Sequence, residues 1–484
     1  MVVSSSTSDF FSSFVWSALF LFLIFLLAFV CILFLVRIHF HRAKEKNDRN
    51  YLNVAFFHPY CNAGGGGERV LWCAIQALQS KYSLIRICVY TGDTDSSPEE
   101  ILQKAKERFN LTLSNVEFIY LHKRTWVEAS RYPRFTLLGQ SLGSLVLGFE
   151  ALRSFVPDVY IDTMGYAFTY PIFSFLAGCK VASYTHYPTI TTDMINAVQS
   201  RRKTCTNRGY IARNPFLTFG KLMYYRMFAA MYKFVGRFSH INIVNSSWTE
   251  DHVNSLWQRP MITFKVYPPC DTTDLQTIPL HRKIDGKIKI VSVAQFREEK
   301  DHPLQLMSMY ELRQMVPEEI WDKVELVLIG STRNEKDEAY VKDLKDLAKH
   351  YSLEENVTFK INIPYNQLKT ELEEGLIGIH TMWNEHFGIG VVECMAAGLI
   401  MIAHKSGGPL MDIVEESNTS RNGFLAADKN EYAQTIAKIL VLSEDARNRI
   451  RESARSSMNR FSSQEFKINF LRAVEPLFGQ MKNS

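Results

Sequence analysis

An uncharged apolar stretch near the N-terminus places the strongest constraint on the fold of this chain. Residues 10–36 contain no charged side chain, and Val15–Val36 consists almost wholly of Leu, Phe, Ile, Val and Ala. Those 22 residues match the roughly 20 that a helix needs to cross a bilayer. Because lipid offers no partner to backbone polar groups, such a segment has to be helical. The sequence therefore predicts a transmembrane anchor, with its flank, over residues 1–48.

The charges beside this stretch predict its orientation. Arg37, Arg42, Lys44 and Lys46 follow it at once, whereas Asp9 is the charge on its N-terminal side. By the positive-inside rule the rest of the chain is expected in the cytosol. A cleaved signal peptide is the alternative, but the run is longer than a typical h-region and has neither a basic n-region nor a small-residue cleavage site.

Composition bounds the rest of the chain. Its 484 residues suggest two or three domains, and a net charge of +5 is too small for this length to mark a nucleic-acid binder. The eight cysteines form no CxxC pair, so neither a zinc site nor a disulfide framework is predicted, which suits a reducing compartment. In the cytosol the four glycosylation sequons would stay unmodified; they begin at Asn110, Asn245, Asn356 and Asn418.

The first large domain is predicted over residues 49–270. Leu52–Phe57 has the pattern of a short buried strand, a glycine run at 64–67 follows it, and helical spacing begins at Glu68. Leu84–Tyr90 is the next apolar strand. A strand, a glycine-rich turn, a helix and a strand open a parallel α/β domain.

The same pattern restarts in a second domain, predicted over residues 287–450. A Pro- and Thr-rich hinge at 271–286 precedes it, and a C-terminal helix within 451–484 is expected to pack back on the first domain. The fold class is therefore α/β, with two Rossmann-like, doubly wound domains and a ligand cleft between them. The predicted strands are Lys287–Val293, Val324–Ile329, Val357–Ile361, Gly378–His380 and Ile400–Ala403, and the predicted helices are His302–Met315, Glu338–His350, Asn366–Glu374 and Gly390–Ala397.

A basic segment within the first domain suggests contact with a membrane surface. Residues 194–249 contain no Asp or Glu, and their cations alternate with large apolar side chains. Such a segment lies well at an anionic bilayer surface, where each basic residue contributes about 1 kcal/mol. A core helix with a basic solvated edge is the alternative. The nine cations are Arg201, Arg202, Lys203, Arg208, Arg213, Lys221, Arg226, Lys233 and Arg237.

The strongest chemical signal lies in residues 383–398. Glu385 stands in a glycine-containing loop, and Glu393 follows eight positions later, in what is expected to be the first turn of a helix. Gly388 and Gly390 let backbone amides approach a ligand, and a helix N-terminus attracts phosphate. Two carboxylates flanking such a turn suit polyol hydroxyls. An acidic first turn is the ordinary structural alternative.

This run resembles the E-x7-E signature of the glycogen-synthase-like retaining glycosyltransferases, which have the GT-B fold. The resemblance implies that Glu385 contacts the donor sugar and that Glu393 contacts the nucleotide ribose. It also implies that the backbone around Phe387, Gly388 and Ile389 contacts the sugar and the diphosphate.

Residues 294–302 resemble the element with which this family binds the donor diphosphate. Lys300 occupies the lysine position, which implies a catalytic role at the leaving group. The usual arginine position holds Gln295, and the nearest arginine is Arg297, two places later. Which of these two reaches the phosphate stays open at this point.

Three further places agree with the resemblance. Gly64, Gly65, Gly66 and Gly67 match the family's glycine-rich loop near the acceptor and the diphosphate, and Gly407 and Gly408 match a glycine loop beside the donor. His186 is expected at a strand end facing the cleft, where the resemblance implies a contact with the donor sugar. A packed or hydrogen-bonded histidine is the alternative there. For His58, Asp162 and Thr163 a structural role is favoured.

No metal site is predicted. The Asp93-Thr94-Asp95 triplet could be mistaken for a metal-binding DxD motif, but it lies in a polar loop and is expected to face solvent. The resemblance implies that Lys, Arg and a helix end neutralise the diphosphate without a metal ion, and that no cofactor beyond the nucleotide sugar is needed.

Taken along the whole chain, these motifs resemble the eukaryotic α-1,2-mannosyltransferases of dolichol-linked oligosaccharide synthesis. That resemblance implies retaining transfer of two mannoses from GDP-mannose to a Man(3)GlcNAc(2) lipid at the cytosolic face of the endoplasmic reticulum. It implies endoplasmic reticulum lipids and other early mannosyltransferases as partners. The alternatives are another lipid-linked hexosyltransferase with a different nucleotide sugar and a non-catalytic membrane adaptor of the same fold. An NAD-dependent oxidoreductase is disfavoured, because Arg69 stands where G-x-G-x-x-G needs a small residue.

Overall fold

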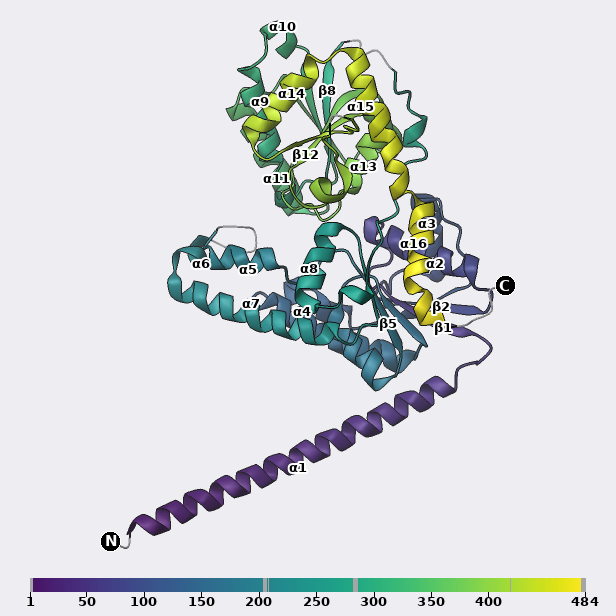
Figure 1. The fold of residues 1–484 in the computed structure, drawn as a ribbon, viewed down its shortest axis with the longest axis vertical. Coiled ribbons are helices and arrows are strands. Elements are labelled where there is room, and N and C mark those ends of the chain that lie inside the picture. The colour runs from purple at the N-terminus through teal and green to yellow at the C-terminus, as the bar shows by residue number, and fades with distance from the viewer. Residues whose placement is uncertain (1–2, 203–206, 208, 282–285, 418, 480–484) are drawn as a thin grey trace.

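The structure, a computed structural model, describes residues 3–202, 207, 209–281, 286–417 and 419–479. A long helix, α1 (Val3–Glu45), precedes two α/β domains, and the second domain lies above the first in the view of Figure 1. The expected architecture of two Rossmann-like domains with an apolar N-terminal helix is confirmed.

The first domain is built on seven parallel strands in the order β3-β2-β1-β4-β5-β6-β7. Successive residues of the central strand β1 (Leu52–Phe57) point to opposite faces: Val54 and Phe56 enter one core, and Ala55 and Phe57 enter the other. Both faces are covered, which explains why this strand is a continuous apolar run. The other strands are β2 (Ile85–Thr91), β3 (Val116–Tyr120), β4 (Val159–Asp162), β5 (Lys180–Thr185), β6 (Ile241–Val244) and β7 (Thr263–Lys265).

Helices pack on both faces of this sheet. Side chains of α2 (Gly66–Lys81) and the C-terminal α16 (Ser463–Phe478) fill one core, and those of α4 (Thr136–Ser154), α7 (Pro215–Gly236) and α8 (Ser247–Trp257) fill the other. The remaining helices of this domain are α3 (Pro98–Phe109), α5 (Thr192–Gln199) and α6 (Gly209–Arg213).

The second domain has six parallel strands in the order β10-β9-β8-β11-β12-β13. Its central strand also divides its side chains between two cores, with Ile290 in one and Val291 in the other. The strands are β8 (Ile288–Val293), β9 (Val324–Gly330), β10 (Val357–Ile361), β11 (Gly375–His380), β12 (Ile400–His404) and β13 (Phe424–Ala426). The helices are α9 (His302–Arg313), α10 (Glu318–Trp321), α11 (Glu335–His350), α12 (Tyr365–Glu374), α13 (Ile389–Ala396), α14 (Lys429–Leu440) and α15 (Glu444–Ser457).

Each sheet reverses its strand order once, and ligands of parallel α/β domains bind at the carboxyl ends of strands beside such a reversal. In the first sheet the reversal lies between β1 and β4, which lead directly into His58 and Thr163. In the second it lies between β8 and β11, which lead into the segments that carry Lys300 and Glu385. The topology therefore brings chemically active residues of both domains to the favoured positions.

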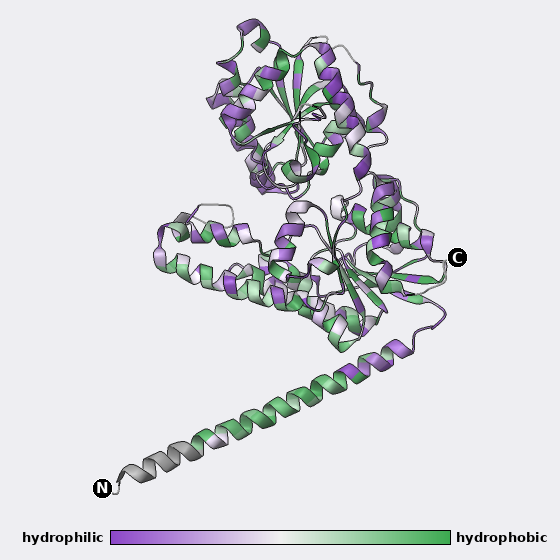
Figure 2. Cartoon of the chain, in the orientation of Figure 1, coloured by the Kyte–Doolittle hydropathy of each residue, from purple (hydrophilic) through white to green (hydrophobic). Residues whose placement is uncertain are grey.

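The helix α1 carries the apolar stretch and is long enough to span a bilayer. Its segment Phe14–Glu45 has a mean hydropathy of 3.5 in the most apolar window, none of which is buried against the protein, and Figure 2 shows this band as the long green part of the helix. Its last turns dock on the first domain. Arg37 Nη1 donates to the Phe175 carbonyl at 2.9 Å, and Lys44 Nζ lies 3.5 Å from Asp158 Oδ1. The basic flank therefore also attaches the helix to the domain.

The basic segment 194–249 includes α5, α6 and the long helix α7. One side of α7 buries Tyr225 and Phe228 in the domain core, whereas Phe216 and Phe219 are 87% and 66% exposed. These exposed rings are compatible with membrane contact, which stays a prediction. Two cations of the segment lie outside the described residues, Lys203 and Arg208.

The chain crosses between the domains twice, and the two crossings run side by side, with Cys270 N donating to the Phe461 carbonyl at 2.9 Å. The segment expected to be a hinge, 271–286, is in part packed on the second domain, because Leu275 and Ile278 are buried in its core. Residues 282–285 of that segment lie outside the described part of the chain.

The C-terminal region returns to the first domain. The boundary expected at residue 450 falls inside α15, whose Ala454 belongs to the core of the second domain, so the return begins later. Helix α16 then places Phe470 in the core of the first domain, and the rings of Phe478 and Tyr82 stack at 4.8 Å. The last helix therefore brings the C-terminal end of the chain into the core of the first domain.

Candidate active site

Glu385 lies in the loop between β11 and α13, and three groups converge on its carboxylate. Lys300 Nζ donates to Oε2 at 2.5 Å, and His380 Nε2 lies 3.1 Å from the same oxygen. The amide of His386 donates to Oε1 at 3.2 Å. The Thr381 hydroxyl also donates to the Lys300 carbonyl at 2.9 Å, which ties the two loops together. The structure thus brings together two of the three residues predicted to be catalytic.

The charge of this cluster is set by its surroundings. Burial opposes ionisation of Glu385, but the hydrogen bond from His380 and the positive charge of Lys300 hold the pKa of Glu385 well below its usual range. Burial lowers the pKa of the neighbouring His386 to about 4, although the carboxylate of Glu385 acts in the opposite direction. Near neutral pH the cluster therefore holds an ionised Glu385 beside a neutral His386.

Glu393 lies in α13, but not where the sequence pattern predicts it. The helix begins at Ile389, so Glu393 is its fifth residue and belongs to the second turn; the prediction of a first-turn carboxylate is wrong. Burial raises the pKa of Glu393 to about 7, and the positive charge of Arg69 opposes this shift. Arg69 Nη2 in turn pairs with Asp271 Oδ2 at 3.0 Å. Glu393 thus stands beside an ion pair of the first domain and the crossing, away from Lys300.

The amino ends of α2 and α13 face each other across the domain boundary. A Cβ placed on Gly66, in the first turn of α2, would lie 2.7 Å from Cδ1 of Ile389, the first residue of α13. Gly388 precedes α13 at φ +110°, a conformation that side chains rarely adopt. Two helix N-termini directed at one another form a site with positive partial charge on both sides, which suits a diphosphate.

The rest of the glycine run shapes the entry to α2. Gly64 has φ +77°, and the Gly65 amide donates to Glu68 Oε2. A Cβ on Gly67 would lie 3.6 Å from His186 Nε2, in ordinary van der Waals contact, so this glycine lies directly beside the histidine. The glycine run at 64–67, which has no side chains of its own, thus contacts residues of both domains.

His186 follows β5 directly and is buried at the same edge of the sheet. Its Nε2 has no hydrogen-bond partner among the residues that the structure describes. Burial, with the neighbouring His58, lowers the pKa of His186 to about 4. The neutral ring therefore offers an unpaired nitrogen beside Gly67, as a ligand contact requires. His58 itself is held between Thr163 Oγ1 at 2.8 Å and Glu68 Oε1 at 3.2 Å, in a structural role.

Gly407 and Gly408 pack against the loop that carries Glu385. The Gly408 amide donates to the Glu385 carbonyl at 2.7 Å, and a Cβ on Gly408 would lie 2.5 Å from the Phe387 carbonyl oxygen. Gly407 adopts φ +58°, and a Cβ there would lie 2.3 Å from the Glu385 carbonyl oxygen. These contacts explain both glycines by backbone packing, and a role at the donor stays a prediction. The Phe387 side chain is buried in the core, so its backbone alone can reach a ligand.

The Arg297 side chain lies near a second arginine, Arg333, that the sequence pattern does not reveal. Its Nη1 lies 3.7 Å from Glu299, and its buried Nε has no partner among the described residues. Burial and the positive charge of Arg333 both lower the pKa of Arg297. Arg333 itself pairs with Asp337, with its Nε 3.0 Å from Oδ2, so the unpartnered Nε of Arg297 is the group that can bind an anion. The Gln295 side chain is exposed.

The triplet at 93–95 departs from expectation. Asp93 is buried rather than solvated: it accepts from the Asn62 amide at 2.9 Å and pairs with Arg124, whereas Asp95 is exposed. The expectation that Asp93 faces solvent is wrong, because its carboxylate is the acceptor for the Asn62 amide in the loop after β1. Within the described ranges no three His, Cys, Asp or Glu side chains are grouped as metal ligands.

Comparisons with known proteins agree with this geometry. Residues 51–257 match a family model described as ALG11 mannosyltransferase N-terminus, and residues 277–457 match Glycosyl transferases group 1. The GDP-Man:Man(3)GlcNAc(2)-PP-Dol alpha-1,2-mannosyltransferase of Homo sapiens is 52% identical over 456 residues, which are 93% of each chain. The protein of the same name from Dictyostelium discoideum is 47% identical over 90% of this chain and 87% of its own. The chain belongs to this mannosyltransferase family.

Solved structures show the same fold as this family member. Anabaena Alr3699/HepE in complex with UDP and glucose superposes with a TM-score of 0.59 at 17% identity, over 88% of this chain and 100% of that one. Sucrose-phosphate synthase from Thermosynechococcus elongatus superposes with a TM-score of 0.62 at 15% identity, over 89% of this chain and 100% of that one. At these identities the likeness concerns the fold alone, which is the GT-B fold that the sequence predicts.

The structure of this mannosyltransferase family member adds residues that the sequence pattern misses. The His386 ring contacts the rings of both Tyr187 and Trp248, with centroids at 4.2 and 5.1 Å, so the Glu385 loop rests on the first domain. Asp412 also joins the domains: it accepts from the Ser247 amide at 2.8 Å. His386 lies within the run 383–398, but no sequence pattern reveals that it meets Tyr187 and Trp248, or that Asp412 meets Ser247. His380 has one sequence signal, as a polar residue at the end of an apolar strand.

Proposed function

We propose that the protein is a retaining α-1,2-mannosyltransferase that moves mannose from GDP-mannose to Man(3)GlcNAc(2)-PP-dolichol. Two successive transfers would give Man(5)GlcNAc(2)-PP-dolichol in the assembly of the N-glycan precursor. The observation that carries this proposal is the meeting of Lys300, Glu385 and the facing ends of α2 and α13 in a chain 52% identical to a relative of that name.

The residues divide the chemistry between the two halves of the donor. As the bond from the sugar C1 to the diphosphate breaks, its electron pair leaves on GDP and positive charge grows on the ring. Lys300, Arg297 and the two helix ends stabilise the departing diphosphate without a metal ion, and the ionised Glu385 and neutral His186 face the mannose. Losing one such electrostatic donor costs about 3–4 kcal/mol, or roughly 10²–10³ in rate.

Glu393, with its partly exposed carboxyl group, binds the ribose hydroxyls in this proposal, and the amides of 387–389 contact the sugar and the diphosphate. The acceptor hydroxyl attacks C1 from the face that the diphosphate leaves, so the configuration is retained and no side chain forms a covalent intermediate. Gly64, Gly65, Gly66 and Gly67 line the acceptor side of the diphosphate.

The proposal includes a location. Helix α1 anchors the protein in the endoplasmic reticulum membrane, the basic flank keeps both domains in the cytosol, and the exposed rings of α7 contact the lipid surface. Other early mannosyltransferases of the pathway are its expected partners. Asn110 is exposed and begins a glycosylation sequon. Removal of an N-glycan from Asn110 by endoglycosidase would place the domains in the lumen and contradict this topology.

Direct product analysis tests the activity. Purified full-length protein is incubated with GDP-mannose and phytanyl-diphosphate-linked Man(3)GlcNAc(2), and the products are resolved by mass spectrometry. Addition of two α-1,2-linked mannoses is expected. Equal or faster transfer from another nucleotide sugar would favour a different lipid-linked hexosyltransferase, and binding without any product would favour the non-catalytic adaptor.

A further inference from the structure

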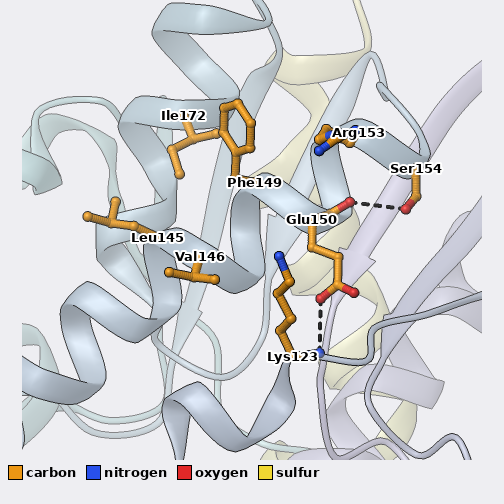
Figure 3. A pocket seen from close by; sticks show the side chains of 8 residues that line it. All are labelled: Lys123, Leu145, Val146, Phe149, Glu150, Arg153, Ser154 and Ile172. Carbon is orange, nitrogen blue, oxygen red and sulfur yellow. Dashed lines mark hydrogen bonds between the residues drawn. The ribbon is translucent and has the colours of Figure 1, made fainter.

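Two adjoining cavities lie where α1 meets the first domain, away from the candidate active site. The smaller, about 330 Å³, is walled by Leu35, Val36 and His39 of α1 and by Phe149 and Arg153 of α4. The larger, about 730 Å³, shares Phe149 and Arg153 and extends along α4 to the turn after β3 (Figure 3). We call the combined surface the α1–α4 groove; its defining residues are Leu35, Val36, His39, Lys123, Phe149 and Arg153.

The groove is apolar at one end and cationic at the other. Leu35 and Val36 end the apolar stretch of α1, whereas Lys123 and Arg153 face the larger cavity. Neither of these cations is paired with an acidic side chain in the described part of the chain. The one carboxylate of the larger cavity, Glu150, is occupied by the amides of His122 and Lys123 at 3.0 and 3.1 Å. Glu150 keeps its negative charge, so this end carries two cations and one carboxylate, and the remaining net charge of +1 attracts an anion.

The α1 end of the groove lies toward the amino edge of the first sheet, whereas Lys123 follows the carboxyl end of the edge strand β3. Lys44 Nζ contacts Asp158 and the Gly178 carbonyl, which directly precede β4 and β5. The candidate residues follow the carboxyl ends of the same strands, and a strand of six residues is about 20 Å long. The α1 end thus lies at the end of the predicted membrane span, with the depth of the sheet between it and the candidate site, and the Lys123 end lies beyond the carboxyl end of β3.

We propose that the α1–α4 groove binds the diphosphate and the first isoprene units of the lipid-linked acceptor. This inference rests on the proposed function. A polyisoprenyl diphosphate combines an apolar chain with two adjacent phosphates, which matches an apolar wall that continues the span and two unpaired cations beside it. The oligosaccharide then bridges the distance along the domain to the mannose site. Lys123 and Arg153 contact the acceptor and take no part at the donor.

Matched acceptors test the assignment on the full-length protein in nanodiscs of neutral phosphatidylcholine. The Lys123→Ala/Arg153→Ala variant is compared with wild type on phytanyl-diphosphate-linked Man(3)GlcNAc(2) and on the same oligosaccharide free in solution. We expect the KM for the lipid-linked acceptor to rise about tenfold or more, with KM for GDP-mannose and the rate on the free oligosaccharide unchanged. Arg153→Lys should keep most of the affinity. Lys104→Ala/Lys106→Ala, which removes two exposed cations of α3, serves as the charge-matched control.

The outcomes separate this inference from the proposed function. Binding of labelled lipid-linked acceptor is measured in parallel, so a wild-type protein that transfers no mannose still reports on the groove. An unchanged KM and unchanged binding in the double variant would overturn the assignment, as would an equal loss on both acceptors. A defect that arises only when anionic phospholipid is added would assign the groove to a bilayer lipid and overturn it too.

Discussion

Lys300 Nζ donates to Glu385 Oε2 at 2.5 Å, although the two residues are 85 positions apart in the chain. The contact forms because β8 and β11 are neighbours at the reversal of the second sheet, so the segments after their carboxyl ends meet. The cation stabilises the ionised carboxylate, and both remain partly accessible, with side-chain exposures of 20% and 12%. The sheet topology thus presents a paired donor and acceptor of charge to a ligand.

Removing the carboxylate of this pair is the most direct test of the site. We expect Glu385→Ala to lower kcat by about 10²–10³, because the positive charge that grows on the sugar loses its nearest anion. Initial rates with GDP-mannose and the phytanyl-linked acceptor measure the effect, and circular dichroism checks the fold. Glu373→Ala, which removes an exposed carboxylate of α12, is the control. Near-normal turnover in Glu385→Ala would refute the assigned role.

His380 is expected to act through Glu385 as a positioning residue. Its Nε2 lies 3.1 Å from the carboxylate, and a hydrogen bond to a charged group is worth about 1.5–3 kcal/mol, or roughly 10–100-fold. His380→Ala should therefore lower kcat by about that factor with little change in the acceptor KM. His380→Gln, which can still donate, should recover part of the loss. A variant that changes the acceptor KM alone would contradict the positioning role.

Glu393 predicts a pH dependence near neutrality. Burial raises the pKa of its carboxyl group to about 7 from an ordinary value of 4.5. If the ionised form binds the ribose, the KM for GDP-mannose falls as pH rises through about 7, and Glu393→Gln loses this inflection. The folding stability has the opposite pH dependence. The contribution of protonated Glu393 to the free energy of unfolding is fully present below pH 4.5 and is lost as pH rises through 7. The Tm of Glu393→Gln relative to wild type should therefore increase from pH 5 to pH 8.

Two histidines cannot produce the same inflection. Burial lowers the pKa of His186 and of His386 to about 4, so both rings stay neutral over this range. A wild-type profile without an inflection near pH 7, or one that survives in Glu393→Gln, would show that Glu393 does not titrate at the donor.

Much of the fold could be predicted from local sequence. The strand β1 was expected at Leu52–Phe57 and lies there, because a fully buried parallel strand is a short apolar run bounded by a Pro and a glycine turn. The second-domain strands follow the same rule. The start of α13 was misjudged by one residue, which moves Glu393 from the first turn to the second. A glycine in the left-handed region caps this helix, and sequence alone does not reveal which glycine of Gly388 and Gly390 takes that position.

The site was predictable only as far as its motif extends. Lys300 and Glu385 are found through a recognised spacing, but other residues at the domain boundary or near the Lys300 loop come from distant parts of the chain. Arg333 follows β9, and Asp412 meets Ser247 across the domain boundary. Such pairs depend on sheet order and on how the domains meet, and neither is encoded in a local pattern. Asp93 was expected to be solvated but is buried. The sequence of a polar loop does not reveal which of its carboxylates accepts a hydrogen bond from a backbone amide.

Gly408 tests whether the glycine loop positions Glu385 by close packing. A Cβ there would lie 2.5 Å from the Phe387 carbonyl oxygen and 2.6 Å from its Cα, both backbone atoms that cannot move independently. Gly408→Ala should therefore displace the loop, lower kcat at least tenfold and lower the Tm by several degrees, since overpacking costs about 1–3 kcal/mol. Gly220→Ala is the control, because no atom lies within 4 Å of its added Cβ. Full activity of Gly408→Ala would exclude this positioning role.

Arg297 and Gln295 compete for one role, and their surroundings favour the arginine. The buried Nε of Arg297 has no partner in the described structure, and the nearby charge of Arg333, which Asp337 offsets only in part, opposes that of Arg297. Binding of GDP would relieve this repulsion. Arg297→Ala is therefore expected to weaken GDP binding about tenfold or more, because a charge-assisted hydrogen bond is lost. Gln295→Ala, which removes an exposed side chain, should change the affinity for GDP less than twofold. Isothermal titration measures the affinity of both variants for GDP. If Arg333 shares the anion with Arg297, Arg333→Ala should weaken GDP binding by a similar factor. The reverse ranking, with Gln295→Ala the weaker binder, would move the diphosphate contact to the position where related enzymes carry their arginine.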